Sequence, residues 1–237
     1  MSASHPNLPR RLSTQICHWW SGSILPKLPL ARAHSQAIGN VSTPAIASGC
    51  WLHAMNVREA IKSVRDDYAE QFDAMVAHQR AKRSDVHLER RMQRPESNLF
   101  GKIYVPDISF GDPMTEWLDL VPRERAGALP SFFLNTPNLV VEFEDLWWDD
   151  VRLDHDGEFT GQLVSWWFNR WMSPADPSTP TPRAEGLSGF IHSVTVDEKW
   201  ICIDLGTATV DALFNILSVA QNCGAKTGRV TSSRSRA

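Results

Sequence analysis

The chain has 237 residues, of which 42% are hydrophobic and 22% are charged, and it contains ten tryptophans. This length and composition suffice for one large domain, or one domain with extensions, around a packed core. No run approaches the eighteen apolar residues of a membrane-spanning helix, so we expect no membrane span.

The net charge of −3 hides an asymmetry between the two halves of the sequence. Residues 1–113 carry 14 Lys and Arg against 10 Asp and Glu, whereas residues 114–237 carry 10 against 17. The acidic second half would repel the phosphate backbone of a nucleic acid, and it is better suited to binding a basic protein. We therefore expect a basic protein partner and no direct binding of nucleic acid.

Residues 1–54 form an extension with three interpretations, because no Asp or Glu precedes Glu59. An acid-free start with arginine and serine is typical of a targeting segment, which implies export. The tetrapeptide at 47–50 (ASGC) resembles a lipoprotein cleavage box, but no apolar core precedes it. The third interpretation is a disordered extension, or sequence upstream of a true start at Met55. We favour this third interpretation.

The cysteines predict a reducing, cytoplasmic location, with export as the alternative. They form no C-x-x-C pair, and no histidines lie near them at zinc-ligand spacing: Cys17, Cys50, Cys202 and Cys223. We expect no metal centre and no cofactor.

The segment 55–100 is predicted to be helical. Apolar residues recur at steps of three and four from Val57 to Val76, which is the period of an amphipathic helix to about Lys82. We expect it to resume or continue through Met92 and to end before Pro95. Its arginine-rich tail is interrupted by acids at helical spacing, which favours a solvated face over a nucleic-acid patch.

The segment 101–231 is predicted to be an acidic α+β domain. Residues 101–113 indicate an edge strand or extended loop, and a short helical piece is expected near Trp117. Alternation predicts strands at 139–143 and 151–153, whereas 159–172 fits either a strand or a helix.

The last part of this domain has the clearest pattern. A proline-rich linker (173–183) precedes a β-hairpin of strands 190–196 and 199–205. A helix over 210–220 ends at Gly224, a short strand follows at 226–231, and residues 232–237 form a loose tail. The fold class is therefore α+β with a mostly antiparallel sheet, a long N-terminal amphipathic helix and a C-terminal β-hairpin–helix–strand unit.

The most informative motif is the run from 142 to 158, with eight carboxylates, two adjacent tryptophans and one arginine. Crowded carboxylates repel one another, and a basic partner would relieve that repulsion while indoles anchor the contact. The predicted partner-binding residues are Glu142, Glu144, Trp147, Trp148, Asp149, Asp150, Asp154 and Asp156. An ordinary solvated acidic face explains the charges equally well.

Catalytic and metal interpretations have less support. The acids do not match a calcium loop, and Pro106-Asp107 lies far from Asp197-Glu198-Lys199, so a metal-dependent nuclease is disfavoured. An acid–base pair from the acidic run with His155 has no specific signature, and we predict no catalytic residues. We expect His192 to be an ordinary half-buried strand residue. The aromatic run 166–171 indicates packing in the core and at its rim. The alternatives are stacking on sugars or bases, and a protein interface formed by Trp167 and Trp171.

These patterns predict a binding protein that neutralises a basic partner, such as a nuclease toxin, by occlusion. The charge pattern alone resembles that of bacterial immunity proteins and antitoxins, and no motif names a family. The alternatives are an enzyme or secreted effector with an acidic, aromatic-lined site, and a structural component with an exposed tryptophan patch.

Overall fold

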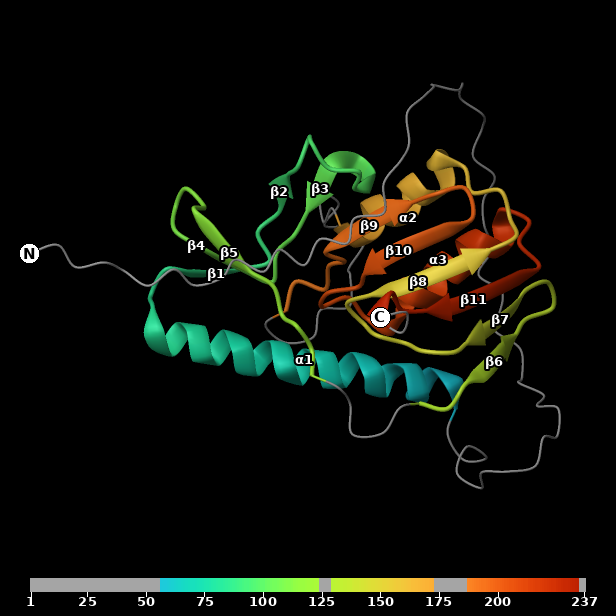
Figure 1. Ribbon diagram of the computed structural model, residues 1–237, viewed down its shortest axis with the longest axis horizontal. Coiled ribbons are helices and arrows are strands. Elements are labelled where there is room, and N and C mark those ends of the chain that lie inside the picture. The colour runs from blue at the N-terminus through green and yellow to red at the C-terminus, as the bar shows by residue number, and fades with distance from the viewer. Residues whose placement is uncertain (1–55, 124–128, 173–186, 235–237) are drawn as a thin grey trace, which may run out of the picture.

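A computed structural model describes residues 56–123, 129–172 and 187–234 (Figure 1). The helices are α1 (Val57–Lys82), the short 3-10 helix η2 (Phe100–Lys102), α2 (Gly161–Met172) and α3 (Val210–Asn222). The strands of the first half are β1 (Val86–Leu88), β2 (Met92–Gln93), β3 (Ile103–Tyr104), β4 (Ile108–Phe110) and β5 (Glu116–Leu118). Those of the second half are β6 (Phe132–Asn135), β7 (Val140–Phe143), β8 (Val151–His155), β9 (Ser193–Val196), β10 (Trp200–Asp204) and β11 (Thr227–Thr231).

A six-stranded sheet with the order β6-β7-β11-β8-β10-β9 organises the fold. Its pairs are antiparallel except for β7 with β11, which run parallel because α3 carries the chain back before β11 begins. Two small sheets accompany it, β1-β4-β5 and β2-β3. The predicted α+β class, the long helix and the β9–β10 hairpin followed by α3 and β11 are confirmed.

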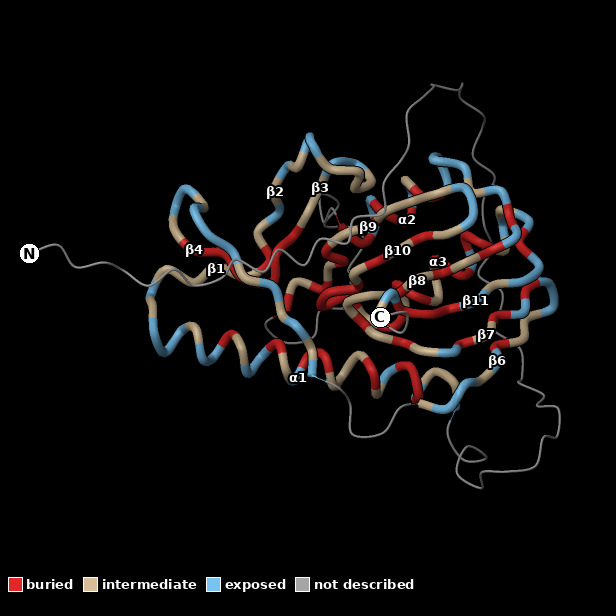
Figure 2. The backbone as a smooth tube through the Cα atoms, in the orientation of Figure 1, coloured by how far each residue is buried: buried red, intermediate tan, exposed pale blue. Residues whose placement is uncertain are grey.

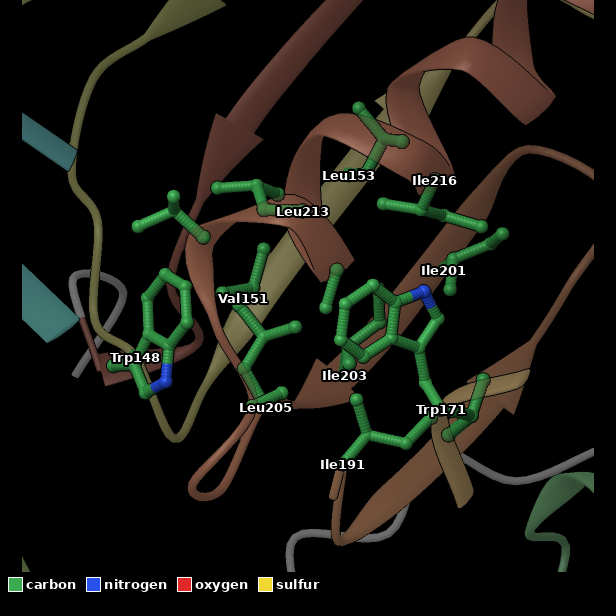
Figure 3. Packing of buried hydrophobic residues seen from close by; sticks show 14 of the residues in the cluster. Trp148, Val151, Leu153, Trp171, Ile191, Ile201, Ile203, Leu205, Leu213 and Ile216 are labelled. Atoms are coloured by element: carbon green, nitrogen blue, oxygen red, sulfur yellow. The ribbon is translucent and has the colours of Figure 1, made fainter. Parts of the chain in front are cut away.

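Helices α2 and α3 cover one face of the large sheet and form the core with it (Figures 1 and 3). Leu213 and Ile216 of α3 and Trp171 of α2 pack with Ile201 and Ile203 of β10, and all five are buried. Side chains alternate between the two faces along each strand. In β8 and β10 the residues that point to this face are therefore buried, and those between them are less buried. The second face carries no described helix.

Helix α1 belongs to the same core as the sheet and is not a separate unit. Its N-cap Asn56 accepts a hydrogen bond from the backbone N–H of Arg58 at 3.0 Å. Its apolar stripe, including Ile61 and Phe72, is buried in the common cluster (Figure 2). The Arg58 guanidinium also pairs with Asp211 at 2.5 Å, which joins α1 to the start of α3.

Two helical predictions in the first half are wrong. The chain after Lys82 forms strands β1 and β2 in place of a continued helix, and β5 replaces the helical piece expected at Trp117. The reason is tertiary: β1 pairs with β4, and β4 pairs with β5. Between β1 and β2, Glu89 has a positive φ of 47°, which no α-helix accommodates.

The structure resolves the segment that the sequence left open. Residues 161–172 form helix α2, and both Trp167 and Trp171 are buried in the core, so neither is exposed for an interface or for stacking. Helix α3 runs to Asn222, and Gly224 follows with a φ of 82°, the left-handed conformation that favours glycine at a helix end.

Several predictions fall outside the described residues: the extension 1–54, the linker 173–183 and the end of the tail at 235–237. Within the three described ranges, no helix has both the length and the apolar character needed to cross a membrane.

Candidate functional site

The sheet face opposite α2 and α3, called the outer face below, carries a row of aromatic and charged side chains. The strand register aligns one residue from each of five neighbouring strands across this face: Phe133, Glu142, Arg229, Asp154 and Trp200. Phe133 exposes 45% of its surface. Side chains in one such row lie within contact distance of their neighbours, so the row forms a continuous surface.

The adjacent rows of the outer face add further acidic side chains. Glu144 and Asp156 are the first residues after β7 and β8, so they lie at the border of this face. Of the eight predicted partner-binding residues, Glu142 and Asp154 therefore lie on this face, and Glu144 and Asp156 lie at its border. Two arginines, Arg152 and Arg229, accompany them, and the face retains an excess of negative charge.

The two arginines of the outer face partly neutralise its acids. Arg229 lies 3.6 Å from the Glu144 carboxylate and 3.7 Å from that of Asp154. Arg152 contacts Asp154 at 2.8 Å and stacks on Trp200 with its Cζ 4.7 Å from the ring centroid. The pairs of Arg229 are the more exposed, and pairs of that kind contribute at most about 1 kcal/mol each.

Asp156 has a structural contact as well as an exposed position. Its Oδ1 accepts hydrogen bonds from the backbone N–H groups of Lys226 at 2.8 Å and Thr227 at 3.0 Å. These bonds favour the ionised form and lower the pKa of its carboxyl. Asp156 therefore positions the start of β11 beside β8.

The tryptophan pair is divided between core and surface, which corrects the expectation that both indoles are anchors. Trp148 is only 2% exposed, and its Nε1–H donates to the Gly206 carbonyl at 2.9 Å. Trp147 is half-buried, and the Arg234 guanidinium lies over its ring at 4.7 Å. Only Trp147 is placed to meet a partner.

Asp149 and Asp150 lie in the β7–β8 loop and bind the residues after β11. Asp149 pairs with Arg234, and Asp150 accepts hydrogen bonds from Ser232 and Ser233. Burial raises the pKa of Asp149 to about 6 against the attraction of Arg234. The eight predicted residues thus occupy three places: the outer face, this loop and, for Trp148, the core.

The raised pKa of Asp149 predicts a pH-dependent effect of Asp149→Asn. A carboxyl whose pKa rises on folding destabilises the folded state as pH increases from its ordinary value of 3.8 to about 6. Asparagine cannot ionise, so Asp149→Asn avoids this destabilisation. Between pH 4 and 7 its free energy of unfolding should rise by up to about 3 kcal/mol relative to that of the wild type. Urea unfolding at both pH values measures this gain. A loss of stability of Asp149→Asn relative to the wild type would show that attraction by Arg234 outweighs burial and lowers the pKa of Asp149.

A buried polar network around His192 is the feature that the sequence did not predict. His192 is 1% exposed, not half-buried as expected. Its Nε2 lies 2.9 Å from Glu89 Oε1, and its Nδ1 lies 3.3 Å from Asp107 Oδ1 and 3.9 Å from Asp204 Oδ1. Tyr68 of α1 donates to Asp107 at 2.6 Å. The network therefore ties α1 and the small sheets to the large sheet.

Electrostatics favour a protonated His192 between ionised Glu89 and Asp107. Burial alone would lower the pKa of His192, but Asp107, Asp204 and Glu89 raise it well above its ordinary value. Burial likewise opposes ionisation of Glu89 and Asp107, and their contacts with His192 outweigh it and lower both pKa values. The side chains of His192, Glu89 and Asp107 are at most 3% exposed, so a substrate has no access to this triad.

Gly206 is required by the same network. It has a φ of 49°, and a Cβ there would lie 2.3 Å from His192 Cδ2. Gly206→Ala should therefore cost about 2 kcal/mol or more. Gly161→Ala is the matched control, because a Cβ there meets nothing within 4 Å and alanine favours the helix. Equal thermal stability of the two variants would contradict the packing at Gly206.

The described residues offer little support for catalysis. A pocket beside the β7–β8 loop, bordered by Tyr68, Trp147, Trp148 and Asp149, has a volume of about 10 Å³, room for about one water molecule. Within the ranges described, no three His, Cys, Asp or Glu side chains are grouped to hold a metal ion. His155 is buried against Phe159 at 4.0 Å, away from any such role. Comparisons with protein-family models, curated proteins and solved structures give no match for this chain.

Proposed function

We propose that the protein neutralises a basic protein partner by occlusion, in the manner of an immunity protein or antitoxin that blocks a toxin such as a nuclease. The observation that carries the proposal is the outer face, a sheet surface that no described helix covers, with two acids in its central row, two more at its border and the exposed Phe133 beside them. Such a surface suits a partner of opposite charge, because complementary potentials steer association and favour the correct orientation.

The shape of this surface favours binding over catalysis. Sheet faces are broad, and Phe133 and Val140, which are 45% and 42% exposed, give apolar contact area beside the acids. The alternative of an enzyme with an acidic, aromatic-lined site has less support, because the pocket at Trp147 has room for about one water only.

Charge reversal on the outer face tests the proposal. The variant Glu142→Lys/Glu144→Lys should lose capture of a basic protein from lysate at low salt, because the attraction becomes repulsion. The matched control Glu70→Lys/Asp73→Lys makes the same change in net charge on exposed positions of α1. A basic protein retained equally by the wild type and both variants would refute binding at this face.

A further inference from the structure

The residues that follow β11 lie on the β7–β8 loop and place an arginine on Trp147. The Arg234 guanidinium pairs with Asp149, and its Cζ lies 4.7 Å from the Trp147 ring centroid. The indole Nε1–H donates to Asp145 at 3.1 Å, which fixes the orientation of the ring. An arginine is thus bound by a carboxylate and an aromatic face, the two groups that best complement a guanidinium.

The neighbouring serines are bound through a second carboxylate. Asp150 Oδ2 accepts hydrogen bonds from Ser232 Oγ at 2.7 Å, from Ser233 N at 3.0 Å and from Ser233 Oγ at 2.7 Å. These contacts include the backbone, so they fix the register of the segment relative to the loop. Ser232 is buried, so these contacts hold the backbone before Arg234 in place and bring its guanidinium to Trp147 and Asp149.

The arginine site has unused hydrogen-bonding capacity. The Asp149 side chain is only 10% exposed, and its Oδ1 is buried without a hydrogen-bond partner. A buried carboxylate oxygen without a donor is costly, and a guanidinium that binds both oxygens would satisfy it. Arg234 engages only Oδ2. The contact with Arg234 therefore leaves one carboxylate oxygen of Asp149 without a donor.

We propose that Trp147 and Asp149 form an arginine-recognition site that the chain's own Arg234 occupies, and that an arginine-bearing segment of the basic partner enters by displacing Arg234. The inference rests on the proposed function for the identity of the partner, but the site is testable without it. Because the resident segment is tethered, it competes at an effective concentration on the order of millimolar. The segment that carries Arg234 therefore weakens binding of the partner's arginine until it is displaced.

A peptide-binding experiment tests the site. The probe is a synthetic peptide of residues 231–236 (TSSRSR), added to full-length Arg234→Ala and to the wild type in isothermal titration calorimetry. We expect the variant to bind the peptide with a Kd of about 0.1 mM, and the wild type about tenfold more weakly, because its tethered segment competes at about 1 mM. The lysine peptide TSSKSK should bind the variant about tenfold more weakly, because lysine lacks the planar fork.

Three outcomes would overturn the inference: no binding to Arg234→Ala at about 5 mM peptide, equal binding to the wild type, or equal binding of the lysine peptide. Thermal unfolding checks that the variant is folded, and Arg234→Lys, which keeps the charge, replaces it if it is not. Peptide binding to the variant with unchanged partner capture by Glu142→Lys/Glu144→Lys would support the arginine site and refute the outer face. Failure of the arginine site can therefore be distinguished from failure of the proposed binding at the outer face.

Discussion

His192→Leu should destabilise the protein by about 3–5 kcal/mol, because it leaves Glu89 and Asp107 buried beside each other without their shared cation. Removal of one member of a buried ion network costs more than the network contributes in sum, since the remaining charges keep their desolvation penalty. Urea unfolding at pH 7 measures the effect. Glu89→Gln, which keeps the shape and the contact with His192, should cost less.

The pH dependence of the wild type follows from the same groups. The raised pKa of His192 gives stability that is fully present below its unfolded value near 6.5 and is lost as pH rises through the higher folded value. The lowered pKa values of Glu89 and Asp107 give stability above their unfolded values that is lost as pH falls. A His192→Leu variant as stable as the wild type at pH 7 would contradict a charged network.

Trp148→Ala should cost about 3–5 kcal/mol, whereas Trp147→Ala should cost about 1 kcal/mol or less. Trp148 is among the largest fully buried side chains, and its removal leaves a cavity and an unpaired Gly206 carbonyl. Trp147 is half-buried and loses mainly its stacking with Arg234. Thermal unfolding of both variants checks the difference.

The two variants also separate stability from binding. Trp147→Ala should weaken peptide binding in the Arg234→Ala background while the fold persists, because the indole face is one side of the arginine site. Similar losses of stability in Trp147→Ala and Trp148→Ala would mean that the division of the pair between surface and core is incorrect.

The sequence predicted the elements whose apolar spacing is regular. Helix α1 and the unit from β9 to β11 were identified by period, since Ile61, Phe72, Leu213 and Ile216 occupy core positions at helical spacing. The segment 161–172 was ambiguous because its aromatics fit both periods, and packing against α3 settled it. The sequence did not predict strands β1, β2, β5 and β6, because they contain only two to four residues, too few for a periodic signal.

The candidate site was harder to predict than the fold. Alternation placed Glu142 on the outer face, but β7 ends before Glu144, and nothing local distinguishes Trp147 from Trp148. The His192 network joins residues more than 80 positions apart, so no local pattern marks it. The positive φ of Glu89 and the requirement for Gly206 are consequences of that long-range contact.

The most direct test of partner binding at the outer face is a measurement of association rates. The captured basic partner is mixed with the wild type and with Glu142→Lys/Glu144→Lys at salt concentrations from about 50 to about 500 mM. The wild type should associate fast, at a rate that falls steeply with salt, and the double variant should associate at least about tenfold more slowly than the wild type at low salt. Equal rates for the two proteins, with the same salt dependence, would contradict a partner-binding role for the outer face.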